Sequence, residues 1–87
     1  MPFNLFIYNS KMSRTDKLKE RLIPFIKESE SETLIEIPNR IMITFKLENV
    51  AVIIQDLLCD KYHKKFQLVE YRETSLKDGY IFEFSSN

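Results

Sequence analysis

The chain has 87 residues, of which 44% are hydrophobic and 13% aromatic, and its 13 basic and 13 acidic residues give a net charge of zero. This composition excludes a disordered chain, and it argues against the net basic surface that most nucleic-acid-binding domains carry. A length of 87 residues predicts one domain, spanning residues 1–87.

The cysteine and glycine content excludes two kinds of site, and the lack of long apolar segments bears on where the protein resides. Cys59 is the only cysteine, so neither an intrachain disulfide nor a cysteine-based zinc site can form. The single glycine leaves no glycine-rich phosphate loop. The sequence carries neither a signal-peptide pattern nor an apolar run long enough to cross a membrane, and we expect a cytoplasmic protein.

The first half of the chain predicts a strand, a helix and two more strands. Phe3–Tyr8 is aromatic and β-branched, as strands are, and Ser13 can cap a helix. Pro24 predicts that this helix kinks, or that it ends near Ile23. The apolar residues at helical spacing are Leu18, Leu22, Phe25 and Ile26.

A polar loop separates this helix from a predicted hairpin. Glu28–Glu32 has no apolar residue, and Thr33–Ile37 then reads as a strand with Ile35 and Ile37 on one face. A turn at Pro38-Asn39 would lead into a further strand, Ile41–Lys46. Its alternation puts Ile41, Ile43 and Phe45 inside, and Arg40, Met42 and Thr44 outside with Phe6 and Tyr8.

The second half predicts a helix and two strands. The helix begins at Glu48 or Asn49 and ends at the basic run Lys61–Lys65. Its apolar stripe is Val50, Ile53, Ile54, Leu57 and Leu58. Strands follow at Phe66–Tyr71 and Tyr80–Phe84, joined by a turn over 74–79 in which Asp78 and Gly79 tolerate a positive φ.

This order matches an α+β fold of the ferredoxin-like βαββαβ type, with four antiparallel strands, two helices on one sheet face and an extra C-terminal strand. The extra strand would place Tyr80, Phe82 and Phe84 on one face, which needs to be covered. Either it folds over the open sheet face, or it adds to the sheet of a second subunit in a homodimer.

The open sheet face is the predicted contact surface. We expect a non-enzymatic protein–protein interaction or regulatory module, whose partner is another protein or a second copy of the chain. The residues predicted to bind the partner are Phe6, Tyr8, Arg40, Met42, Tyr71, Tyr80, Phe82 and Phe84.

Leu5-Phe6-Ile7-Tyr8-Asn9 resembles the first-strand motif of RNA-recognition-motif domains, in which the aromatic at the position of Phe6 stacks on a base. In the family's second motif, Pro38–Phe45 keeps only Ile43 and Phe45, while Arg40 and Met42 replace the stacking aromatics. This resemblance implies an alternative function, single-stranded RNA binding through Phe6, Tyr8 and Arg40.

The element order is also similar to the small CRISPR-adaptation subunit and virulence-associated protein D group. These proteins are ferredoxin-like homodimers, and some are metal-dependent nucleases. The group has an acidic residue after an aromatic at the end of strand one, where this chain has Tyr8 and then Asn9. The resemblance implies at most a degenerate nuclease, with Asn9 or Glu36 near the metal.

The remaining polar residues predict no catalytic, metal or cofactor site. His63 stands among lysines, Cys59 reads as a small core residue, and the carboxylates show no paired spacing. The charge is unevenly distributed, however. Basic residues dominate residues 11–27 and four glutamates occupy 28–36, which predicts a basic helix face beside an acidic loop.

Overall fold

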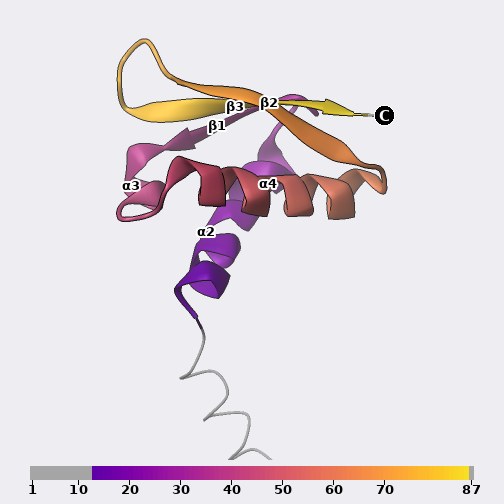
Figure 1. Cartoon of the computed structure of the whole chain (residues 1–87), viewed down its shortest axis with the longest axis horizontal. Coiled ribbons are helices and arrows are strands. Elements are labelled where there is room, and N and C mark those ends of the chain that lie inside the picture. The colour runs from indigo at the N-terminus through magenta and orange to yellow at the C-terminus, as the bar shows by residue number, and fades with distance from the viewer. Residues whose placement is uncertain (1–12, 87) are drawn as a thin grey trace, which may run out of the picture.

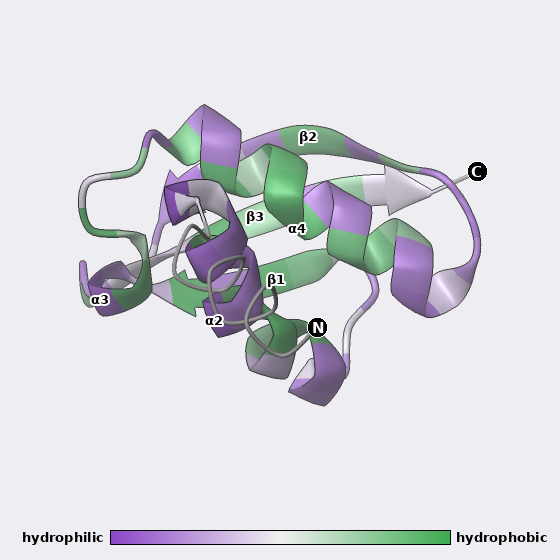
Figure 2. Ribbon diagram, turned by 90° about the horizontal axis from the view of Figure 1, so that it is seen from below, coloured by the Kyte–Doolittle hydropathy of each residue, from purple (hydrophilic) through white to green (hydrophobic). Residues whose placement is uncertain are grey.

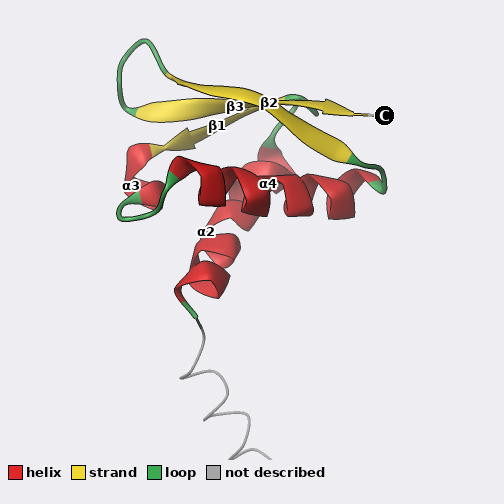
Figure 3. Cartoon of the chain, viewed as in Figure 1, coloured by secondary structure: helices red, strands yellow, loops and turns green. Residues whose placement is uncertain are grey.

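The computed structural model describes residues 13–86, which form an α+β fold with helices and strands in separate layers (Figure 1). In chain order the elements are α2 (Arg14–Glu28), β1 (Leu34–Pro38), α3 (Asn39–Met42), α4 (Leu47–Tyr62), β2 (Phe66–Glu73) and β3 (Gly79–Ser86). The helices lie on one side of the sheet (Figure 3), as predicted for the two long ones. The predicted strand Phe3–Tyr8 lies outside the described residues. The sheet within residues 13–86 has three strands, so the four-stranded ferredoxin-like order is not shown.

The last strand of the chain is the central strand of the sheet. The order is β1-β3-β2, and both pairings are antiparallel. Phe82 pairs with Ile35 on one side and with Tyr71 on the other. The expectation that this strand folds over the open face or joins a second subunit is therefore wrong, because strands of the same chain occupy both of its edges.

Helix α4 has the apolar stripe that the sequence predicts. All five stripe residues are buried, and they share one core cluster with Phe82 and Phe84 of β3. The helix ends where His63 adopts a left-handed conformation with φ 56° and donates its backbone N–H to the Cys59 carbonyl at 2.9 Å. Seen from the helix side, apolar segments of α4 lie over apolar stretches of the strands (Figure 2).

Helix α2 continues through its proline. The Ser13 hydroxyl accepts the Asp16 amide at 3.1 Å, which confirms the predicted cap. The predicted end near Ile23 is wrong, because the helix extends to Glu28. Pro24 is exposed, so water can solvate the carbonyl that it leaves without a partner, while core residues of α2 on either side of it stay buried.

The predicted hairpin and the strand Ile41–Lys46 are wrong. The segment forms α3, a single helical turn, and then a loop before α4. Ile41 and Met42 are both buried, whereas the side chain of Ile43 is 65% exposed. Burial of two neighbours suits a helical turn that faces the core, whereas a strand would alternate.

The β2–β3 turn forms where predicted, but a different residue has the positive φ. Lys77 takes the left-handed conformation with φ 59°, and Gly79 has no positive φ. Gly79 instead allows β3 to approach β1 closely, because a Cβ at this position would lie 2.5 Å from the Ile37 carbonyl oxygen. Glycine is therefore needed at position 79 because a side chain would not fit there.

We predict that Phe82→Ala costs about 3–5 kcal/mol of unfolding free energy, because it leaves a cavity in the central strand. Phe82 is 0% exposed. Leu76→Ala is the control, since Leu76 is 82% exposed in the hairpin turn and should change stability by less than ~0.5 kcal/mol. Urea denaturation of the two variants measures the difference, and equal losses would contradict the central position of β3.

Candidate functional site

The structure places most of the predicted contact residues in or beside the core. Phe82 and Phe84 are 0% and 2% exposed, and Met42 is 5% exposed. Tyr71 and Tyr80 are half-buried, and the Tyr71 hydroxyl donates to Glu48 Oε1 of α4 at 2.8 Å, so this ring is on the helix side. The described rings therefore do not form an open-face platform, because their alternation follows that of buried Ile35 and Ile37 in β1.

Three other residues, Phe6, Tyr8 and Arg40, are also predicted to contact the partner. Phe6 and Tyr8 lie outside the described residues. Arg40 is exposed, but it sits on α3 at the end of β1 and not on the sheet. The exposed ring patch that suggested a homodimer is thus not found among the described rings, since Phe82 and Phe84 of β3 are buried in the core and Tyr80 is half-buried.

The open face of the sheet carries charge instead of rings. The register aligns Leu34, Glu83 and Glu70 across the three strands, and Glu36, Ile81 and Arg72 in the next row. A bulge between Leu68 and Glu70 brings Glu70 opposite Glu83, because it changes which side chains of β2 face outward. Arg72 Nη1 lies 3.1 Å from Glu70 Oε2 and 3.2 Å from Glu83 Oε1.

A hollow of about 440 Å³ borders the outer edge of this face. It is lined by the end of α2, the acidic loop and β1, and it shares Leu34 and Glu36 with the sheet. We call the combined surface the acidic face. Its charged and aliphatic residues are Glu28, Glu30, Leu34, Glu36, Glu70, Arg72, Ile81 and Glu83, and the hollow is also lined by Phe25, Ser29 and Ser31. Glu28–Glu36 could be recognised as acidic from the sequence, whereas Glu70 and Glu83 join it only through strand pairing.

A second hollow, of about 150 Å³, lies where α2 meets the loop after α3. We call it the basic pocket. It is lined by Arg14, Lys17, Leu18, Arg21, Ile43, Thr44 and Phe45. The predicted basic face of this helix is therefore confirmed for Arg14, Lys17 and Arg21 of α2.

The loop side of the basic pocket has an unusual backbone. Thr44 has a φ of 72°, which β-branched residues rarely adopt. Arg14 Nη2 donates to Thr44 Oγ1 at 2.5 Å and to the Thr44 carbonyl at 3.4 Å. The guanidinium carbon of Arg14 lies 4.9 Å from the centre of the Phe45 ring, so a cation–π contact accompanies these hydrogen bonds.

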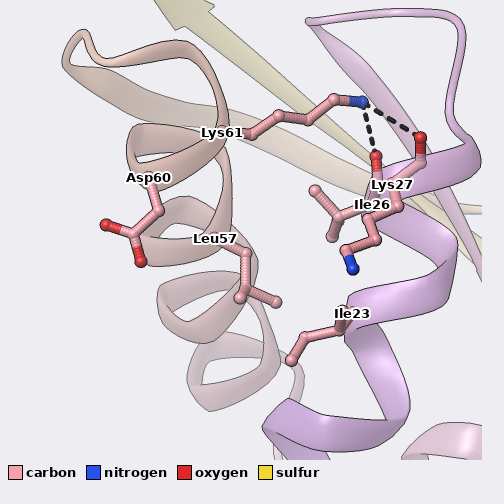
Figure 4. Close-up of a pocket in the computed structure, with 6 residues that line it drawn as sticks. All are labelled: Ile23, Ile26, Lys27, Leu57, Asp60 and Lys61. Carbon is pink, nitrogen blue, oxygen red and sulfur yellow. Dashed lines mark hydrogen bonds between the residues drawn. The ribbon is translucent and has the colours of Figure 1, made fainter.

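A third hollow, of about 300 Å³, is an apolar groove between α2 and α4 (Figure 4). Ile23, Ile26 and Leu57 line it, with charged side chains at its border. Lys61 of α4 donates to the Ile26 carbonyl at 2.7 Å and to the Lys27 carbonyl at 3.4 Å. This lysine caps the carboxyl end of α2, where helix carbonyls lack partners.

Residues 13–86 contain few groups that could bind a metal ion or act in catalysis. No group of three His, Cys, Asp or Glu residues within 13–86 could hold a metal ion. Asn9 lies outside this range, and Glu36 is exposed on the acidic face. Cys59 is a half-buried free thiol. Between residues 13 and 86, no helix combines the length and the apolar character that crossing a membrane requires.

Comparison with protein families, curated proteins and solved structures found no match to this chain. The resemblances to RNA-recognition-motif domains and to the small CRISPR-adaptation subunit group therefore stay predictions.

We predict that Lys61→Met destabilises the protein by about 1 kcal/mol, because it removes the cation that caps α2 while keeping the apolar stem. Lys65→Met is the control, since Lys65 is an exposed lysine just beyond α4. Chemical denaturation compares them. A loss of the same size in both variants would show that general charge, and not the cap, causes the effect.

We predict a pH effect at Tyr71. Its hydrogen bond to Glu48, together with burial and the Glu48 charge, raises the pKa of Tyr71 above 10.0. Folding favours the protonated phenol, so this stabilisation is complete below pH ~10 and is lost as pH rises through the raised pKa. Phenolate absorbance should show that Glu48→Gln returns the pKa of Tyr71 toward 10.0, whereas Asp56→Asn leaves it raised. The absorbance change that is lost in Tyr71→Phe is the one that belongs to Tyr71.

Proposed function

We propose that this protein is a non-enzymatic interaction module that binds a positively charged protein partner through the acidic face. The observation that carries the proposal is the continuity of charge from the acidic loop across the open side of the sheet. Five glutamates face one arginine on this surface. In the described part of the chain, no element covers it (Figure 3).

The acidic face also offers apolar contact area. Leu34 is 44% exposed and belongs both to the hollow and to the first row of the sheet, while Ile81 is half-buried at the centre of the second row. Apolar residues surrounded by charge are the arrangement of many transient interfaces, where the apolar part supplies affinity and the charged rim supplies orientation.

The charge of this face supports a protein partner over RNA. An RNA strand on the sheet would place its phosphates against Glu36, Glu70 and Glu83, and Arg72 is already paired with two of these. Among the described strands, the rings of Tyr71 and Phe82, which could stack on bases, face the helices. Binding of RNA to the sheet in the manner of RNA-recognition-motif domains is therefore the less favoured function.

The proposal predicts that Glu30→Lys/Glu36→Lys abolishes partner capture. Tagged full-length protein would be incubated with host extract, with and without nuclease, and the bound proteins identified by mass spectrometry. A supporting result is a basic protein that wild type retains after nuclease treatment and that this double variant loses. Its affinity for the purified partner should fall at least ~10-fold.

Glu20→Lys/Asp56→Lys is the matched control. It makes the same change in net charge at exposed positions of α2 and α4, on the helix side of the molecule. The control should bind like wild type. Equal loss in both double variants, or a partner released by nuclease, would contradict a protein-binding acidic face.

A further inference from the structure

We infer that the basic pocket is a binding site for a phosphate group. This site lies on the helix side of the molecule and is independent of the acidic face. The ligand chemistry is a single phosphate, which a small phosphorylated compound or the backbone of a nucleic acid could supply. Arg14, Lys17 and Arg21 are the groups that would contact it.

The three cations of the pocket converge without a counter-charge. Arg14, Lys17 and Arg21 are three and four residues apart, so they follow one face of α2, and all three line the same hollow. None of them forms an ion pair with another residue in 13–86. No carboxylate lines the pocket in this part of the chain, and residues 1–12 contain neither Asp nor Glu.

Gathering these cations here is electrostatically costly. Like charges repel, and Arg14 and Lys17 also stand in the first turn of α2, where the helix dipole favours anions. A bound anion would relieve both effects. Asp16, the acidic residue of that turn, does not line the pocket.

The Arg14 guanidinium is preorganised for an anion. One of its nitrogens, Nη2, donates to Thr44, and its central carbon lies over the ring of Phe45. A guanidinium has five N–H donors in a fixed plane, and within residues 13–86 only Nη2 of Arg14 forms hydrogen bonds, so its other donors could bind oxygen atoms. Thr44, which accepts these hydrogen bonds, has a positive φ of 72°, and strained backbone of this kind is found more often at ligand sites.

The pocket is large enough for the proposed group. Its volume is about 150 Å³, so one phosphate group can lie beside the cations. The hollow opens to solvent, and the rest of a larger ligand could extend outside it.

The test is titration of the full chain with inorganic phosphate, with pyrophosphate and with a single-stranded oligonucleotide, followed by NMR and calorimetry. Lys17→Gln/Arg21→Gln removes two cations and keeps Arg14, whose contacts with Thr44 are structural. Lys19→Gln/Lys27→Gln is the matched control, because it removes two cations of α2 that do not line the pocket. Thermal melts establish that both variants fold.

We expect phosphate or pyrophosphate to shift the amide signals of Thr44 and Phe45, and the affinity to fall at least ~10-fold in Lys17→Gln/Arg21→Gln only. An oligonucleotide that binds far more tightly than pyrophosphate would identify nucleic acid as the source. Its salt dependence should then weaken by about one unit of slope for each lost phosphate contact. No binding at millimolar phosphate, or equal loss in the two variants, would overturn the site.

Discussion

The rings of Phe82 and Phe84 share one buried cluster with the apolar stripe of α4, and every described helix and strand contributes at least one residue to this cluster. Such rings bury on the order of 150–250 Å² each, which makes them the largest apolar contributions in a small core. Because β3 carries them, it must lie in the middle of the sheet under the helices. Its two edges then pair with β1 and β2, and Gly79 permits the close approach to Ile37.

This arrangement places acidic and basic side chains on opposite sides of the molecule. Once the apolar side of each strand faces the helices, the alternate side chains point to the opposite surface, where the glutamates of all three strands meet. The cations of α2 are left on the helix side, beside the loop after α3. A chain with zero net charge can thus present an acidic surface and a basic pocket that different partners would recognise.

Helix α2 is held at both ends by residues distant in sequence. At its amino end Arg14 contacts Thr44, and at its carboxyl end Lys61 contacts the Ile26 carbonyl. These contacts, with the buried residues on its inner face, explain how a helix with a proline at position 24 remains continuous. They also place the basic pocket and the apolar groove at opposite ends of the same helix.

Local patterns in the sequence determined the two long helices, the Ser13 cap, the alternation of Ile35 and Ile37, and the strands of the C-terminal hairpin, because periodicity and capping act within a few residues. The tertiary structure alone decided that β3 is central and that residues 39–42 form a helical turn. It also decided that Glu70 and Glu83 join the acidic loop. These outcomes depend on which apolar surfaces meet across the chain, and the burial they provide outweighs the small conformational preference of a segment such as Ile41–Lys46.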